Sequence, residues 1–140
     1  MADNFIKNIM KATGADKLDI KEISPSVLAY VGDAVYEMYI RTYMVSHGGN
    51  NPHKLHRKSV GFVKAKAQSE ILLAIYEELS EEEMDIARRG RNAKSGKIPK
   101  NADVSDYRHA TGFEALIGYL YLTGKTTRLE DILKMCITVK

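Results

Sequence analysis

The stretch LAYVGDAVYEMYI, residues 28–40, decides the fold, because it is a long apolar segment that carries Asp33 in its middle. Just before it, Ser24 is a residue type that caps helices, and Pro25 suits a first helical position, where its missing N–H would have had no partner. Beyond it, the sequence HGG at residues 47–49 is a typical helix terminator. We therefore predict a helix that begins at Pro25 and ends near these glycines.

Along this helix, apolar side chains recur three and four residues apart, which is the spacing of one helix face. We expect this stripe to face the core; it consists of Val27, Leu28, Val31, Ala34, Val35 and Met38. Asp33 lies to one side of the stripe, on a mixed face that it shares with Ala29, Tyr30, Glu37 and Ile40. That face is expected to be only partly covered.

The segments that follow also have helical rather than alternating periodicity. Asn51 and Pro52 are typical of a helix start, and Gly61 is a point at which this second helical segment can split in two. Ser80 and Glu83 have the spacing of a capping box, in which each side chain binds a backbone N–H of the other. A short helix is predicted from there to about Gly90.

The last third of the chain reads as a loop followed by two helices. Residues 91–102 are basic, contain Gly, Ser and Pro, and lack apolar periodicity. A long helix is predicted within residues 105–124, and another within 126–140, where Thr127 and Glu130 have capping-box spacing. The whole chain, residues 1–140, is therefore expected to form a single all-α domain.

Composition sets broad limits on the environment. Lys and Arg number 21 against 18 Asp and Glu, a balance that suits many soluble proteins. The single cysteine, Cys136, excludes an internal disulfide and a cysteine-based zinc site, which favours a reducing compartment. No signal peptide is evident, and no window approaches the roughly 18 uninterrupted apolar residues of a membrane span. We expect a cytoplasmic protein without a membrane segment.

Two carboxylates occupy similar surroundings in separate helices. Asp33 follows Gly32, and Glu114 lies in an apolar helix between Gly112 and Gly118. Glycine inside a helix costs about 1 kcal/mol relative to alanine, a cost that is tolerated mainly where another backbone must approach closely. Asp33 alone is compatible with an ordinary exposed residue. If the two glycine-bearing helices pack together, however, the carboxylates meet, and a hard divalent cation relieves their repulsion.

These residues lie in motifs that resemble a known family. YVGDAVYE, residues 30–37, resembles the signature of the ribonuclease III catalytic domain, and FEALIGYLYL, residues 113–122, resembles that family's second catalytic helix. The chain is most similar to the bacterial Mini-ribonuclease III branch, which has a catalytic domain and no double-stranded RNA-binding domain. SPSVLAYVGDAVYE, RRGRNAK and YRHATGFEALIGYLYL all resemble that branch, so the similarity covers nearly the whole chain.

The resemblance implies a ribonuclease III endonuclease-domain-like helical bundle that pairs as a homodimer and hydrolyses both strands of double-stranded RNA with Mg²⁺. By position, Asp33 corresponds to the signature aspartate and Glu114 to the essential glutamate, and both are expected to be catalytic residues and metal ligands. The implied products carry a 5′-phosphate and a 3′-hydroxyl. The implied role is the maturation of structured ribosomal RNA precursors, such as the 23S rRNA precursor.

The chain departs from the longer ribonuclease III enzymes at two acidic positions. Ala29 stands where they carry a glutamate four residues before the signature aspartate, and Thr111 stands where they carry an aspartate three residues before the essential glutamate. This favours a hydrated ion held by fewer protein ligands. Glu37, one turn after Asp33, either contributes indirectly or is a surface residue.

Without an appended binding domain, the RNA must be held by the catalytic body. Each phosphate that Lys or Arg neutralises releases counterions, and A-form RNA is recognised largely by its shape and sugars. The candidate RNA-binding residues are Arg88, Arg91, Asn92, Lys94, Lys97, Lys100, Lys64 and Lys66. The alternative for the basic loop is a solvated linker, and some of the lysines of the earlier run are compatible with an ordinary outer face.

The sequence alone leaves two other functions possible. A catalytically silent RNA-binding dimer would keep the fold, as the acids missing at Ala29 and Thr111 suggest. A helical protein-interaction domain would have no salt-dependent affinity for RNA. Neither function needs a pair of carboxylates set among glycines, which favours the nuclease.

Overall fold

The computed structural model describes residues 5–93 and 98–139, and in this part of the chain every regular element is helical. The prediction of an all-α fold is therefore confirmed. Three short 3-10 turns, Ala15–Lys17, Ile20–Glu22 and Tyr76–Glu78, connect some of the helices. The α-helices are α1 (Phe5–Thr13), α2 (Pro25–Gly48), α3 (Pro52–Val63), α4 (Ala65–Ile75), α5 (Glu81–Arg91), α6 (Val104–Leu122) and α7 (Thr126–Thr138).

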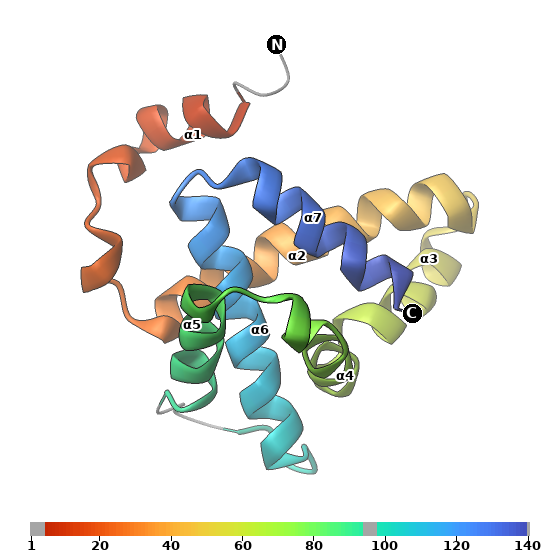
Figure 1. Ribbon diagram of the computed structural model, residues 1–140. Coiled ribbons are helices and arrows are strands. Elements are labelled where there is room, and N and C mark those ends of the chain that lie inside the picture. Colours follow the sequence, from red (N-terminus) through yellow and green to blue (C-terminus); the bar gives the residue numbers. More distant parts are fainter. Residues whose placement is uncertain (1–4, 94–97, 140) are drawn as a thin grey trace.

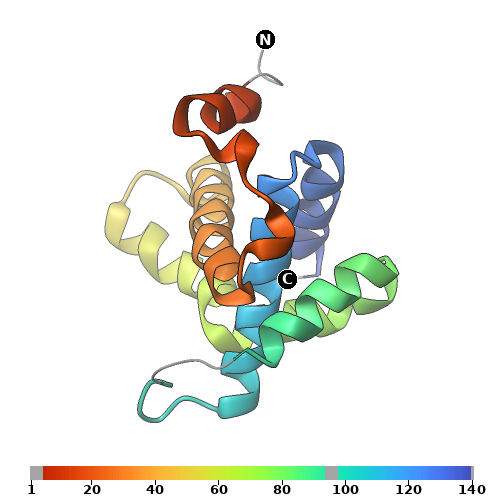
Figure 2. The same cartoon turned by 90° about the vertical axis from the view of Figure 1, so that its left-hand side faces the viewer.

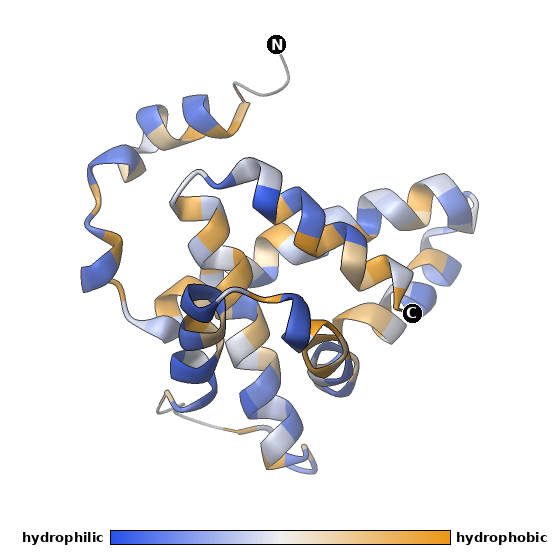
Figure 3. Cartoon of the chain, viewed as in Figure 1, coloured by the Kyte–Doolittle hydropathy of each residue, from blue (hydrophilic) through white to orange (hydrophobic). Residues whose placement is uncertain are grey.

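Helix α6 runs through the middle of the molecule, and the other long helices pack around it (Figure 1). Helix α1 lies at one edge, and the segment that joins it to α2 follows one side of the body (Figures 1 and 2). The hydrophobic stretches gather on α4 and on the middle of α6, whereas α5 is mostly hydrophilic (Figure 3). Within the described residues, no helix has the length and apolar character that crossing a membrane requires.

Side-chain caps fix three helix starts as the sequence predicts. The Ser24 hydroxyl accepts a hydrogen bond from the Val27 N–H, directly ahead of Pro25. The side chain of Asn51 likewise accepts from two backbone N–H groups at the start of α3. The capping box of α5 has both of its bonds, because the Ser80 N–H donates to Glu83 and the Glu83 N–H donates to the Ser80 hydroxyl.

Two local predictions are wrong. The second helical segment breaks at Lys64, whose backbone is extended, and Gly61 continues α3. Nothing lies within 4 Å of a β-carbon added to Gly61, so this glycine marks no close contact. At the start of α7 the N-cap residue is Lys125, without a side-chain cap, so Thr127 lies inside the helix and makes no capping box with Glu130.

The core forms where α2, α4, α6 and α7 meet. Tyr36 of α2 and Phe113 of α6 are fully buried, and their rings contact edge to face with centroids 4.9 Å apart. The Tyr36 hydroxyl donates to the Phe62 carbonyl, so its polar end is satisfied inside the fold. Further fully buried residues of this core are Ile40, Ile71, Ile75, Leu116, Ile117, Leu120 and Ile132.

The predicted core stripe of α2 is wrong in part. Leu28 and Val35 are buried as expected and Val31 is half-buried, but the other three members, Val27, Ala34 and Met38, are exposed. The buried face is instead formed by Leu28, Ala29, Gly32, Val35, Tyr36, Ile40 and Met44. The reason is that α2 has apolar residues on two faces, so its periodicity does not indicate which face meets the core.

Glycines let α6 touch its neighbours backbone to backbone. Gly32 of α2 and Gly118 of α6 face each other, and a β-carbon on Gly118 would lie 1.9 Å from the Leu28 carbonyl oxygen. On another side of α6, Gly112 meets α5 near Gly90, where a β-carbon on Gly112 would lie 2.4 Å from the carbonyl oxygen of Ala87. The glycines that neighbour Asp33 and Glu114 in the sequence, Gly32, Gly112 and Gly118, therefore mark close helix crossings.

Helix α5 is also tied to the end of the chain. The Arg128 side chain of α7 donates to both carboxylate oxygens of Glu83, each at 2.8 Å, and to the carbonyl of Glu78 at 2.7 Å. Glu83 is buried, and this contact with Arg128 keeps the pKa of its carboxyl below the usual range. One carboxylate thus both caps α5 and joins it to α7.

Candidate active site

The crossing of α2 and α6 brings Asp33 and Glu114 together. Gly32 lies against the backbone of Glu114, so the residue next to Gly32 is carried to the same place. The Asp33 carboxylate is close enough to share a hydrogen bond with the Glu114 carboxyl and to repel its charge. Asp33 is exposed and Glu114 is half-buried. The structure thus places the two carboxylates as the glycines indicated, while their roles as catalytic residues and metal ligands stay predictions.

Glu114 holds its proton far more tightly than an ordinary glutamate. Its pKa rises from 4.5 to about 8, first because the group is buried and then because Asp33 shares a hydrogen bond with it and repels its charge. The negative charge of Glu37 raises the pKa further. At neutral pH and without a cation, Glu114 is therefore mostly protonated, and a bound cation would displace the proton.

Glu37 contributes to the charge of this site without a direct bond to Glu114. Its carboxylate pairs with Arg41 one turn further along α2, with 3.4 Å between Oε2 and Nη2. The Arg41 side chain is exposed, so this pair adds little to stability. Of the two readings of Glu37, the structure therefore favours an indirect, electrostatic contribution.

A third polar side chain, Gln68 of α4, lies beside the carboxylates. It is only 2 % exposed, and its amide acts on Glu114 as a hydrogen-bond donor that lowers the pKa of that carboxyl. Its Nε2 donates to the Val63 carbonyl at 2.8 Å, while its buried Oε1 has no partner among the described residues. Sequence reasoning missed Gln68. The available signal was a polar residue at helical spacing with the core residues Ile71 and Leu72.

These groups fit a hydrated divalent cation. Carboxylate and amide oxygens are the hard donors that such cations take, and Mg²⁺ commonly keeps several waters beside one or two carboxylates. Across residues 5–93 and 98–139, no three His, Cys, Asp or Glu side chains come close enough together to enclose an ion. Ala29 supplies no donor, and the Thr111 hydroxyl donates to the Tyr107 carbonyl of its own helix at 3.1 Å.

The described members of the predicted RNA-binding set lie on or next to two helices, α4 and α5, and in the segment ahead of α6. Lys64 and Lys66 stand exposed at the start of α4, where Lys64 is one turn before Gln68. Asn92 is exposed at the end of α5, and Lys100 is exposed ahead of α6. Two further predicted contacts, Lys94 and Lys97, lie outside the described residues.

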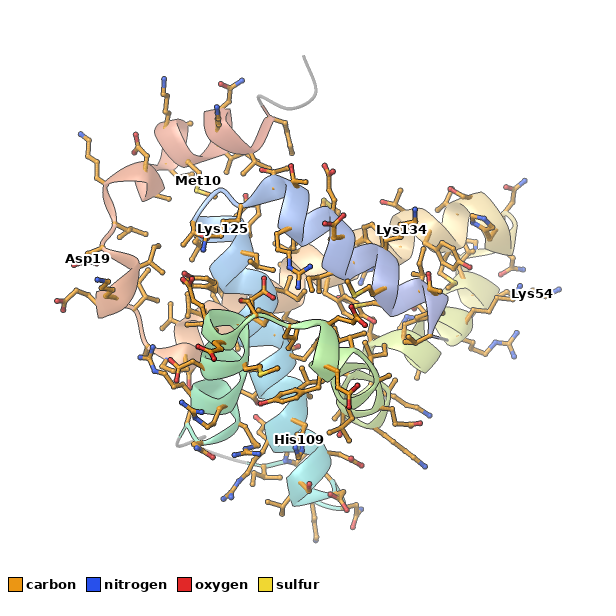
Figure 4. All side chains as sticks on the ribbon, in the orientation of Figure 1. Met10, Asp19, Lys54, His109, Lys125 and Lys134 are labelled. Atoms are coloured by element: carbon orange, nitrogen blue, oxygen red, sulfur yellow. The ribbon has the colours of Figure 1, made fainter. Side chains whose placement is uncertain are left out.

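Arg88 and Arg91 border a cavity of about 230 Å³ between α4, α5 and α6. His109, labelled on α6 in Figure 4, lines the same cavity together with Tyr76. Arg88 also makes an ion pair with Asp85 one turn earlier on α5. This side of the molecule therefore presents cationic groups around a hollow.

The exposed face of α2 is apolar. Tyr30 is 80 % exposed and Met38 is 58 % exposed, although both belong to a well-packed helix. They recur at helical spacing in a set that we call the α2 stripe: Val27, Tyr30, Ala34, Met38 and Val45. Exposed apolar side chains gathered along one helix in this way are typical of a surface that another protein covers.

Comparisons with known proteins agree with this arrangement. Residues 26–125 match the family model described as the ribonuclease III domain. The chain is 53 % identical to the Mini-ribonuclease 3 of a Thermoanaerobacter species, over 96 % of this chain and 93 % of the relative. It is 52 % identical to the Mini-ribonuclease 3 of Clostridium tetani, over 88 % of this chain and 82 % of the relative.

A solved structure has the same fold. The crystal structure of a protein from Fusobacterium nucleatum superposes with a TM-score of 0.75 and is 37 % identical in sequence. The match covers 86 % of this chain and 96 % of that protein. The helical arrangement described above is therefore also found in an experimental structure.

Proposed function

This chain belongs to the ribonuclease III family and is an endoribonuclease of that type, and on this premise we propose that it is a Mg²⁺-dependent homodimer that cleaves double-stranded RNA. We further propose that it is a single catalytic domain that acts in the cytoplasm on structured ribosomal RNA precursors, including that of 23S rRNA. The rRNA substrate and the location rest on the family resemblance alone. Membership of an enzyme family speaks against a catalytically silent RNA-binding dimer and against a protein-interaction domain.

The observation that carries the catalytic part is the meeting of Asp33 and Glu114. A bound Mg²⁺ would activate a water for attack on a phosphodiester and stabilise charge on the phosphoryl oxygens. Asp33 is exposed and so could face both the ion and the RNA, whereas Glu114 would hold the ion from the more buried side. Cleavage would leave a 5′-phosphate and a 3′-hydroxyl.

The surfaces around the site support an RNA duplex and a second protomer. Lys64 and Lys66 begin the helix that carries Gln68, and Arg88 and Arg91 border the cavity beside α6. These cations are suited to phosphates, together with Asn92 and Lys100 and with Lys94 and Lys97 of the basic loop. The α2 stripe supports dimerisation, because a homodimer interface would remove its apolar side chains from water.

Cleavage of a labelled RNA duplex tests the catalytic assignment. Asp33→Asn and Glu114→Gln keep the shape of each side chain but remove its negative charge, and each is expected to lower turnover at least about a thousandfold, a loss typical for transition-state groups. Glu130→Gln is the matched control, because this carboxylate is exposed on α7 and takes no part in the site. If both site variants fold and cleave at the wild-type rate, the assignment of these two carboxylates is wrong.

A further inference from the structure

On the basis of the RNA-cleaving function above, we propose that the cavity of about 230 Å³ between α4, α5 and α6 is a subsite for one unpaired nucleotide of the RNA substrate. The base would enter the hollow, and the phosphate of the same nucleotide would lie on the cationic rim. The contacts proposed so far neutralise phosphates only. This inference adds the recognition of a base that lies next to the duplex.

The inside of the cavity suits a flat apolar group. Leu72 of α4 and Ala87 of α5 are each 2 % exposed and line the hollow together with the half-buried ring of Tyr76. Proteins that bind unpaired RNA bases commonly stack them on aromatic side chains. The cavity is smaller than the roughly 300 Å³ at which pockets for drug-sized ligands begin, so it has room for one base and not for two.

The rim of the cavity suits a phosphate. Arg88, Arg91 and His109 line it (Figure 4), and among the described residues no Asp or Glu does so. Arg88 pairs with Asp85 outside the hollow. Arg91 donates through Nε to the Asn92 side chain at 3.4 Å and makes no ion pair within the described part of the chain. The outer nitrogens of its guanidinium are therefore available to the oxygens of a phosphate.

The ring of His109 is oriented by its own helix. Its Nδ1 lies 2.8 Å from the Ser105 carbonyl oxygen, which can only accept, so Nδ1 carries the hydrogen of this bond. The other ring nitrogen, Nε2, has no hydrogen-bond partner among residues 5–93 and 98–139. A neutral ring would accept at Nε2 from a base N–H or from the ribose 2′-hydroxyl, and a protonated ring would donate to the phosphate.

The cavity lies close to the carboxylates on α6. His109 and Glu114 are five residues apart on this helix, which is about 8 Å along its axis. Between them, Gly112 lies against Ala87 of the cavity wall, and a β-carbon on Gly112 would be 2.4 Å from the Ala87 carbonyl oxygen. One RNA molecule can therefore place its duplex at the carboxylates and an adjoining unpaired nucleotide in the cavity.

Photo-cross-linking of the unaltered protein tests the inference directly. A duplex with one unpaired 4-thiouridine, placed at each position of one strand in turn, is bound in Ca²⁺ and irradiated. At one or a few positions the cross-link is expected to map to residues 72–76 or to His109. The same nucleotide in a base pair is the control and is expected to leave these residues unlabelled. Cross-links that fall outside the cavity at every position would overturn the inference.

Binding measurements in Ca²⁺ add a quantitative readout. The wild type is expected to bind the duplex with the unpaired nucleotide about tenfold more tightly than the fully paired duplex, a gain within the range of one stacked base. Tyr76→Leu keeps an apolar side chain without the ring, and it is expected to reduce this preference to less than about twofold while its affinity for the paired duplex stays unchanged. A wild type without the preference, or a folded Tyr76→Leu protein that keeps it, would overturn the inference.

Two further variants guard against a loss of folding. Tyr121→Leu is the matched control, because Tyr121 is also half-buried against the main core but does not line the cavity. It is expected to keep the tenfold preference. Leu73→Glu replaces Tyr76→Leu if that protein does not fold, since Leu73 lines the cavity and is 60 % exposed. Its carboxylate would repel the phosphate, so the preference is again expected to disappear, and a retained preference would count against the subsite.

The same series separates this inference from the proposed function. A wild-type protein that cleaves duplex RNA in Mg²⁺ but binds paired and unpaired forms equally well would remove the subsite and leave the nuclease standing. A wild-type protein that neither binds nor cleaves RNA would remove both.

Discussion

Gly32 lies so close to Glu114 that a β-carbon on Gly32 would be 1.7 Å from the Glu114 carbonyl oxygen. Backbone cannot move aside as a flexible side chain can, so even a methyl group at this position must push α2 and α6 apart. The separation of the two helices, and with it the contact between Asp33 and Glu114, is therefore set by the absence of a side chain at residue 32.

Gly32→Ala is accordingly expected to destabilise the protein by about 3 kcal/mol or more, as severe overpacking does. Gly61→Ala is the matched control, because Gly61 is exposed in a helix and has open space around it. That change is expected to be neutral or to stabilise by up to about 1 kcal/mol. Urea unfolding of the two variants measures both values, and equal effects would contradict the close contact described here.

Glu114 makes the stability of the metal-free protein depend on pH. Its pKa is about 8 in the folded chain against 4.5 as a free side chain, so the folded protein binds the extra proton between these values. Stability from this group is therefore fully present below about pH 4.5 and is lost as the pH rises through 8. Glu114→Gln removes the ionisation. We expect its melting temperature to match the wild type near pH 5 and to exceed it by several degrees at pH 8.5, both in EDTA.

The α2 stripe predicts a dimer that a single charge disrupts. Met38→Glu places a carboxylate in the middle of the stripe and is expected to give a folded monomer by sedimentation, whereas the wild type sediments as a dimer. Leu73→Glu is the matched control, since Leu73 is 60 % exposed but lies on α4. A wild-type chain that remains monomeric at tens of micromolar would contradict the proposed interface.

The basic groups on α5 predict a salt-dependent affinity for RNA. Arg91→Ala is expected to weaken binding of duplex RNA in Ca²⁺ and to reduce the slope of log K against log salt by about 1, the change for one lost phosphate contact. Lys134→Ala removes an equal charge from α7 and serves as the control (Figure 4). Filter binding at several salt concentrations measures both slopes, and the same small effect in each variant would argue against a phosphate contact at Arg91.

Local helix signals in the sequence were reliable where a single side chain defines the geometry. Ser24 with Pro25, and Ser80 with Glu83, mark helix starts because the capping bonds join residues three positions apart. The same signal failed at Thr127. The helix begins at Thr126, so the threonine lies inside the first turn and cannot cap it. Capping-box spacing therefore shows that a capping box is possible. Whether it forms depends on the residue at which the helix actually begins.

The orientation of α2 could not be obtained from its own residues. Met38 and Tyr36 are both large and largely apolar, and only contact with α6 determines that Tyr36 is buried while Met38 is exposed. Gly32 contained the missing information, since a close backbone crossing must lie on the core side. The predicted stripe passed over that glycine.

Of the residues at the candidate site, only the charged ones could be predicted from the sequence. Asp33 and Glu114 stand out because carboxylates are unusual beside glycines in apolar helices. Gln68 does not stand out, since a neutral amide is common on helix surfaces. Its burial and its hydrogen bond to the Val63 carbonyl are properties of the packed molecule.

The contact between Glu83 and Arg128 has a consequence for the order in which this protein is completed on the ribosome. Helix α5 emerges with its capping box available from local residues, but Arg128 lies 45 residues further along the chain than Glu83 and is synthesised later. Until then the Glu83 carboxylate has no arginine, and α5 cannot take its final anchorage against α7. Because α6 precedes α7 in the chain and already packs closely against α5, Arg128 adds a late polar anchor to a helix that α6 can hold first.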